Sequence, residues 1–183
     1  MTVATLPQAG TWIIDPSHSS VEFVVRHLVV TKVRGRFGEF SGTITVDPAD
    51  PTASNVEVTI QTTSISTGDD QRDAHLRTSD FFSADEFPTL SFRSTAVRAA
   101  GSDYEVEGDL TIKGVTKPVT LSLEYNGTSP DPWGGTRAGF SAETEINRRD
   151  FGLDFDVKLD TGGALVGEKI KVQLEVEATL KQG

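Results

Sequence analysis

The chain contains no cysteine among its 183 residues. This absence excludes disulfides, thiolate catalysis and metal sites built from cysteine ligands. The first residues, MTVATLPQAGTW, supply neither the basic nor the apolar segment of a secretory signal. A cytoplasmic location is therefore expected.

Long apolar runs and an excess of positive charge are lacking as well. No stretch approaches the roughly 18 apolar residues of a membrane-spanning helix, so no stable membrane insertion is expected. Seventeen Lys and Arg residues stand against 27 Asp and Glu, a formal net charge of -10. That balance opposes extended contact with nucleic acid or an anionic bilayer, because both attract basic surfaces.

No low-complexity tract interrupts the chain, and 36% of its residues are hydrophobic. This composition is typical of a globular protein, and the length suits one domain with a substantial core. We expect a single domain over residues 1–183, with residues 1–10 as a flexible N-terminus.

Apolar and polar residues alternate along most of the chain, as in half-buried β-strands. The clearest case is the final segment, where Ile170, Val172 and Leu174 alternate with polar residues as far as Lys181. About eight such strands, several of them long, predict an all-β fold, an antiparallel β-barrel rather than a sandwich. A barrel of roughly this size can enclose one small ligand.

The stretch from Asp70 to Phe92 breaks the alternation. Its aromatic residues recur without strand periodicity, and Ser79 and Ser83 offer caps for short helical turns that Pro88 ends. We expect this short helical insertion to cover the barrel as a lid.

Two further segments are expected to lie outside the strands. Residues 126–135, rich in Gly and Pro, predict a loop at one rim, and Gly114-Val115-Thr116 predicts a tight hairpin turn. Residues 147–155, NRRDFGLDF, predict a second compact cluster that covers the barrel mouth.

Four motif blocks, spread over nearly the whole chain and in the same order, resemble the YceI family. They are Trp12 to Phe40, RDAHLRTSDFF with Phe87-Pro88, GDLTIKGVTKPV from Gly108, and NRRDFGL from Asn147. The resemblance implies a lipocalin-like barrel that holds a long isoprenoid or similar amphiphilic lipid, commonly as a homodimer. Many members of that family carry a signal peptide, and this chain departs from that pattern.

The predicted lipid contacts are residues on inward-facing strand positions, in the lid and in the mouth cluster. They are Phe23, Val25, His27, Phe40, Phe81, Phe82, Phe87, Leu110, Ile112, Phe140, Phe151 and Phe155. Taken singly, each aromatic suits a filled core as well as a cavity; the combination of barrel and lid favours a cavity.

Two basic clusters are candidates for binding a lipid head group. Arg148 and Arg149 follow a predicted strand at the mouth, and Arg26, Lys32, Arg34 and Arg36 gather within eleven residues. A phosphate or quinone head group could dock at either cluster. The alternative is that these cations pair with local carboxylates or support a dimer contact.

Catalytic and metal sites have weaker support. His18, His27 and His75 lack metal-binding spacing, so no metal and no cofactor other than a lipid is expected. Ser17-His18 or Ser20 with Asp15 could be imagined as a hydrolytic triad, but no Gly-x-Ser-x-Gly motif is present. Residues 162–169 are a near miss to a phosphate-binding loop, and their glycines suit a hairpin better.

The sequence therefore predicts a binding protein that transports, stores or sequesters a polyisoprenoid such as an isoprenoid quinone or a prenyl phosphate. Two alternatives stay open. One is an enzyme acting on such a lipid, with His27 as the candidate titratable group, and the other is a filled-barrel structural or stress protein without a ligand.

Overall fold

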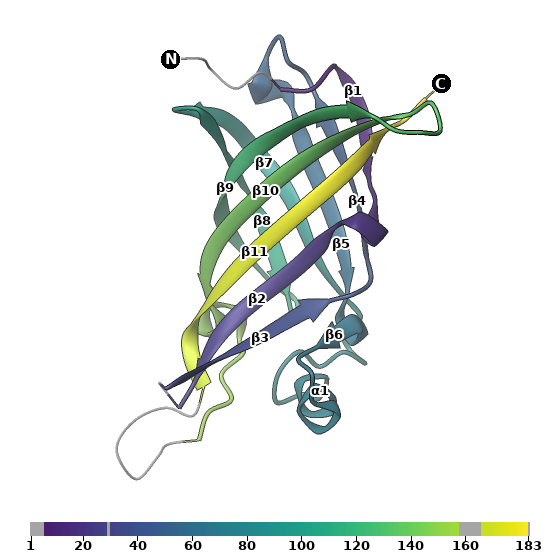
Figure 1. Ribbon diagram of the computed structural model, residues 1–183. Coiled ribbons are helices and arrows are strands. Elements are labelled where there is room, and N and C mark those ends of the chain that lie inside the picture. The colour runs from purple at the N-terminus through teal and green to yellow at the C-terminus, as the bar shows by residue number, and fades with distance from the viewer. Residues whose placement is uncertain (1–5, 29, 158–165, 183) are drawn as a thin grey trace.

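Eleven strand segments form one antiparallel sheet that closes on itself (Figure 1). The computed structural model describes residues 6–28, 30–157 and 166–182. The segments are β1 (Gly10–Ile14), β2 (Ser20–His27), β3 (Thr31–Phe37), β4 (Phe40–Val46), β5 (Asn55–Gln61), β6 (Ile65–Ser66), β7 (Thr89–Ala100), β8 (Asp103–Ile112), β9 (Val115–Pro130), β10 (Thr136–Asn147) and β11 (Val166–Leu180). The helical elements are η1 (Pro16–His18), η2 (Pro51–Ala53), η3 (Thr62–Ser64), α1 (Asp70–Leu76) and η4 (Arg148–Phe151).

Three of the barrel strands are interrupted, so eleven segments make eight strands. β1 continues into β2 after η1, β3 into β4 after residues 38–39, and β5 into β6 after η3. β11 closes the barrel because it pairs with β1 near Leu180 and with β2 near Leu174. The predicted eight-stranded antiparallel barrel with a short helical insertion is confirmed.

The end of the barrel that holds β1 and the end of β11 is filled by side chains. Trp12 and Ala178 have no exposed surface, and Phe140 stacks on Tyr125 with ring centroids 5.5 Å apart. Leu6 packs against this core, while residues 1–5 of the expected flexible N-terminus lie outside the described residues. Because side chains fill this end, a ligand site inside the barrel has to lie towards the opposite end.

The helical insertion between β6 and β7 is tied to the barrel by polar contacts. Asp69 caps α1 by accepting a hydrogen bond from the backbone of Arg72, and buried Asp73 accepts two from Thr67. Arg77 donates to the carbonyl of Ile65 in β6. No helix of the described chain has the length and apolar character needed to cross a membrane.

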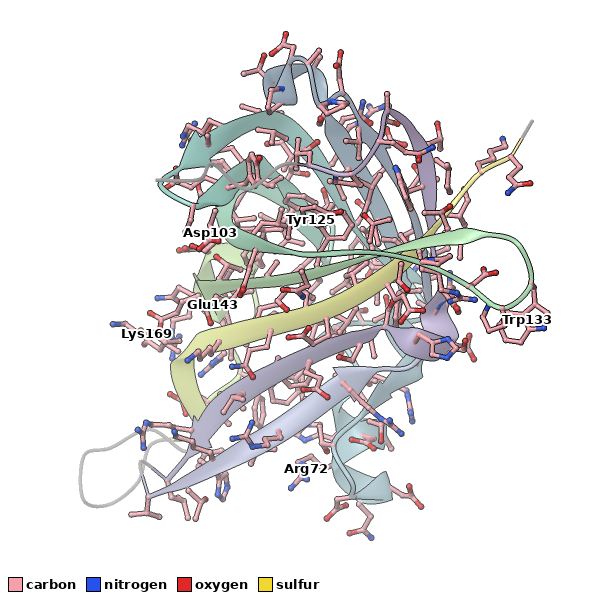
Figure 2. The ribbon with its side chains drawn as sticks, turned by 45° about the horizontal axis from the view of Figure 1, so that its top comes forward. Arg72, Asp103, Tyr125, Trp133, Glu143 and Lys169 are labelled. Carbon is pink, nitrogen blue, oxygen red and sulfur yellow. The ribbon has the colours of Figure 1, made fainter. Side chains whose placement is uncertain are left out.

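Two local predictions need adjustment. The first half of the expected rim loop at residues 126–135 is strand, because β9 runs to Pro130, and residues 131–135 form the turn. The pairing of β9 with β10 shifts register between Gly139 and Phe140, and such a bulge interrupts the strict alternation of a strand. The predicted tight hairpin is present, but its turn is formed by Lys113 and Gly114, both with positive φ. Trp133 projects from the short β9–β10 turn and is 82% exposed (Figure 2).

Candidate functional site

An apolar cavity of about 160 Å³ lies inside the barrel, at the end that carries the helical insertion. Its walls come from β2, β3, β5, β7, β8, β10 and β11, from α1 and η4, and from the segments that follow these two helical elements. Its lining consists of Val21, Glu22, Phe23, Val25, Phe37, Ile60, Leu76, Phe81, Phe82, Leu90, Leu110, Ile112, Ile146, Arg148, Leu153, Val166, Ile170 and Val172. Glu22 and Arg148 are the charged residues at an otherwise apolar border.

Strand alternation explains how these side chains reach the cavity. Phe23 and Val25 project inward from β2, and Ile170 and Val172 project inward from β11 beside them. Gly35 on β3 lies beneath the Phe23 ring: a Cβ at that position would come within 2.2 Å of the ring. Because Gly35 has no side chain, the ring of Phe23 can lie over β3 and form part of the cavity wall.

The lid supplies one side of the cavity through Leu76, Phe81 and Phe82. Phe82 meets Phe37 edge to face at 5.9 Å. The far part of the insertion is held by a hydrogen bond from Thr62 Oγ1 to the carbonyl of Phe87, 2.8 Å long. The aromatic residues thus close the cavity while the polar contacts fix the segment to the rim.

Six of the predicted lipid contacts line this cavity: Phe23, Val25, Phe81, Phe82, Leu110 and Ile112. Reasoning from sequence left out most of the aliphatic wall. On β11, Ile170 and Val172 carried the clearest alternation in the chain, and that signal marks them as inward-facing.

Three predicted contacts are buried in the core and do not line the cavity. Phe40 packs at the start of β4 opposite Ile60, and Phe140 belongs to the filled end of the barrel. Phe151, 1% exposed, is the last residue of η4. All three belong to the same cluster of buried hydrophobic residues, where other side chains surround them.

The other three lie at the periphery. His27 stands at the end of β2, opposite Thr31, where the sheet passes beyond the cavity. Phe87 packs on the β8–β9 turn at Gly114, and Phe155 packs on His75 and Phe81 with centroids 4.9 and 5.0 Å away. His27 is therefore not the titratable group at the cavity base that an enzyme would need.

Arg148, predicted as a head-group ligand at an exposed rim, is instead 3% exposed. Its Nη1 donates to the carbonyls of Leu153 (2.5 Å) and Phe155 (2.9 Å), its Nε to Gly167 (2.9 Å) and its Nη2 to Val166 (3.1 Å). Burial is the main cause that lowers the pKa of this guanidinium. Arg148 therefore joins the segment after η4 to the start of β11.

Arg149, the second predicted head-group ligand, lies in an ion-pair network at the surface. Its Nε lies 2.8 Å from Glu168 Oε1, and its Nη2 lies 3.2 Å from Asp156 Oδ2. The two neighbouring arginines thus have different surroundings, one buried against carbonyls and one half-exposed between carboxylates.

Among the described residues, one group brings together three side chains that could ligate a metal: Asp15, His18 and Glu177. Arg137 already occupies the space between the carboxylates, with its Nη1 2.9 Å from Asp15 and 2.7 Å from Glu177. A divalent ion would have to displace this guanidinium, so the cluster fits a structural ion pair better than a metal site.

The same cluster lacks the geometry of a hydrolytic triad. His18 Nδ1 lies 2.9 Å from Asp15 and 3.0 Å from Ser17, so one ring nitrogen faces both groups. A triad needs the two ring nitrogens to serve different partners. Asp15 acts as the cap of η1, and the hydrogen bond from the Ser17 hydroxyl, with that from Arg137, holds its pKa well below the usual range. The phosphate-loop alternative covered residues 162–169. Residues 162–165 lie outside the described part of the chain, and residues 166–169 begin β11.

Comparison with known proteins gives a consistent result. The family model for the YceI-like domain matches residues 12–178. Protein YceI of Escherichia coli O17:K52:H18 is 43% identical over 163 residues, which cover 89% of this chain and 82% of that protein.

Two solved structures share the barrel. The structure of Burkholderia cenocepacia BcnA has a TM-score of 0.77 at 25% identity, and covers 90% of this chain and 98% of its own. A domain from Saccharophagus degradans, described as polyisoprenoid-binding and implicated in plant cell wall breakdown, has a TM-score of 0.71 at 18% identity. The alignment covers 95% of this chain and 100% of that domain.

Proposed function

The chain belongs to the YceI family, and from that membership and its apolar cavity we propose that it binds the hydrocarbon chain of an isoprenoid lipid inside the barrel. The protein would transport, store or sequester this lipid without changing it chemically. The cavity carries the proposal: its wall combines side chains from seven strands with a lid of aromatic residues.

The isoprenoid class draws on the Saccharophagus degradans domain, which is described as binding a polyisoprenoid. At 18% identity that likeness concerns the fold, so the ligand class is our inference for this chain. Burial of hydrocarbon supplies the affinity: each methylene contributes about 0.8 kcal/mol, so about ten give roughly 8 kcal/mol, equivalent to micromolar binding.

The size of the cavity constrains how such a lipid enters. At about 160 Å³ it is similar to an engineered cavity of about 150 Å³ that binds benzene. A long hydrocarbon chain therefore requires the wall of the cavity to move. The lid is the suitable part because it is a short insertion that lines the cavity through Leu76, at the end of α1, and Phe82, in the turns that follow. We propose that outward movement of the lid lengthens the cavity on lipid binding.

The surroundings of the two predicted head-group arginines favour an uncharged head group such as a quinone. Arg148 directs its donors to backbone carbonyls, and Arg149 is engaged by Glu168 and Asp156. An anionic head group would have to compete with these partners. A neutral one avoids the cost of burying an unpaired charge.

The test is lipid analysis of the purified protein, with Val25→Phe compared with Val24→Phe. Val25 lines the cavity, whereas Val24 lies on the outer face of the same strand. Mass spectrometry of an organic extract should detect an isoprenoid in the wild type and in Val24→Phe, and at least tenfold less in Val25→Phe. Native melting curves for both variants establish that the barrel is intact.

Absence of any lipid from the wild type, together with failure to take up an isoprenoid quinone added in detergent, would support the filled-barrel alternative. A chemically altered isoprenoid recovered after incubation would instead indicate an enzyme. Equal lipid content in the two variants would place the ligand outside this cavity.

A further inference from the structure

The outer surface of β2, β3 and β11, next to the cavity, is basic. Because Phe23, Val25, Ile170 and Val172 face inward, the residues that alternate with them face outward. Strand pairing sets Arg26 beside Lys32, and β11 lies along the other edge of β2. Six of the chain's 17 Lys and Arg residues gather here: Arg26, Lys32, Arg34, Arg36, Lys169 and Lys171. We refer to these six as the basic face; Figure 2 shows Lys169 pointing outward at its edge.

Most of these cations have no partner within the described chain. Lys169 lies 3.9 Å from Glu145, and the other five make no ion pair or side-chain hydrogen bond with another described residue. Elsewhere, cations such as Arg98 and Arg137 are paired with carboxylates. The acidic neighbours are Glu22 on β2, Glu145 on β10 and Glu168 on β11, and Glu168 is paired with Arg149. The six cations outnumber these carboxylates, so the local charge is positive although the chain's is not.

Exposed aliphatic residues lie at the same end of the barrel. The β2–β3 turn carries Leu28, 38% exposed, and Val30, 77% exposed. The segment after η4 runs to this end as well (Figure 1), and Val157, its last described residue, is 47% exposed. We refer to Leu28, Val30 and Val157 as the aliphatic tip.

We propose that the basic face and the aliphatic tip dock the protein on an anionic lipid bilayer. Lysine and arginine near an anionic leaflet each strengthen binding about fivefold, and exposed aliphatic side chains enter the head-group layer. The negative charge of the rest of the chain is screened: β11 alone has 15 residues, about 50 Å of strand, against a Debye length of about 10 Å at 0.1 M salt. A second copy is disfavoured as the occupant because two basic faces repel each other.

The proposed docking surface lies at the same end of the barrel as the cavity. Val166 pairs with His27 at this end, and Val25 and Val166 both line the cavity. Docking would therefore bring the cavity end of the barrel against the bilayer, a source of apolar ligands. The proposal extends the proposed function but does not depend on it, since bilayer binding and lipid retention are measured separately.

The test is co-sedimentation of the full chain with vesicles of phosphatidylcholine alone or mixed with phosphatidylglycerol. The wild type should bind the anionic vesicles at least tenfold more strongly than the neutral ones at about 0.1 M salt, and lose this preference near 1 M. A Lys32→Gln, Lys171→Gln double variant should bind anionic vesicles about 25-fold more weakly, from about fivefold per cation. The matched control, Lys117→Gln with Lys181→Gln, removes the same charge from β9 and from the residue after the far end of β11, and should stay within twofold of the wild type.

A second pair of variants tests which end docks. Val30→Ser, in the aliphatic tip, should weaken binding to anionic vesicles severalfold. Trp133→Ser, in the β9–β10 turn, should leave it unchanged, because strand register places that turn at the opposite end of β11. Circular dichroism confirms that each variant is folded.

Three outcomes would overturn the proposal. They are no vesicle binding by the wild type, equal losses in the two lysine double variants, and a larger loss in Trp133→Ser than in Val30→Ser. If the wild type copurifies with an isoprenoid but does not bind vesicles, the proposed function stands and bilayer docking is wrong. The basic face would then suit an acidic protein partner instead.

Discussion

At the residue scale, Arg148 shows how a charged side chain can serve as a structural cross-link. Its guanidinium is buried and bonds the carbonyls of two segments that are distant in sequence, residues 153–155 and 166–167. Buried carbonyls left without donors are costly, so the residue stabilises the rim even though burial opposes its charge.

We therefore expect Arg148→Gln to lower the free energy of unfolding by about 2 to 4 kcal/mol, because several buried hydrogen bonds are lost together. The adjacent Arg149→Gln is the matched control. It removes a half-exposed ion pair, so its effect should stay below about 1 kcal/mol. Urea denaturation of both variants makes the comparison, and equal changes would contradict the structural role of Arg148.

Asp15 makes a second residue-scale prediction, concerning pH. Hydrogen bonds from Ser17 and Arg137 lower its pKa in the folded state below the value of about 3.9 expected in the unfolded chain. The folded state thus binds fewer protons at this group, and the stabilisation is present above about pH 4 and lost as pH falls towards the folded pKa. Asp15→Asn should therefore destabilise the protein at pH 7, by about 1 to 3 kcal/mol, and the difference from wild type should shrink as the pH falls below about 4 towards the lowered pKa of the folded state.

The check is a series of thermal or urea melts across this range, with Asp103→Asn, at an exposed strand position, as the control substitution. If the gap between wild type and Asp15→Asn stayed constant with pH, the hydrogen bonds would not favour the ionised carboxyl.

At the scale of elements, the β2–β3 pair couples backbone shape to the cavity. Phe23 and Gly35 are directly opposite each other in the register, and the ring of Phe23 covers the glycine. A side chain on β3 at this point would force the ring towards the cavity, where its neighbours are Val21 and Val25.

Gly35→Ala should therefore lower stability by about 1 to 3 kcal/mol through overpacking and reduce retained lipid by moving Phe23. Gly38→Ala is the matched control, because the nearest atom to its added Cβ is 4.0 Å away. Its effect should lie within about 0.5 kcal/mol. Denaturation midpoints and lipid content are both measured, and the idea fails if the two variants behave alike.

At the scale of the whole molecule, the barrel divides into a packed end and a hollow end. Aromatic residues such as Trp12, Tyr104 and Phe140 fill the first, where exposed fractions are 3% or lower. The second is lined by aliphatic residues and closed by the lid. The packed end supplies stability, which allows the other end to retain space.

Because a ligand bound to the folded state alone stabilises it, loading the hollow end should raise the melting temperature. At a free lipid concentration of about 100 times Kd the gain is about 2.7 kcal/mol, or roughly 5 to 10 °C for a domain of this size. Calorimetry of delipidated and quinone-loaded protein measures the shift. The Val25→Phe variant should show a much smaller one, and an equal shift in both would indicate binding outside the cavity.

The sequence by itself determined the strands, the inward faces and the class of fold. Alternation at period two places every second residue of a strand on one face, and that rule correctly identified Phe23, Val25, Leu110 and Ile112 as inward residues that meet the cavity. The break in alternation after Asp70 likewise located the helical insertion. The homodimer remains a prediction from the family resemblance.

Only the tertiary structure decided where each inward-facing side chain lies along the barrel axis and which groups each charged side chain contacts. Alternation tells which face of the sheet a residue lies on but not its position along the barrel axis. Phe140 therefore shared the inward pattern and yet fills the packed end, and Phe40 is buried opposite the cavity-lining Ile60 without lining the cavity itself. The carbonyls that bind Arg148 come from two segments that only chain folding brings together, which is why a rim arginine in the sequence is a buried cross-link in the structure. The sequence showed four cations of the basic face as a local cluster, but Lys169 and Lys171 join them only because β11 pairs with β2, which lies far earlier in the chain.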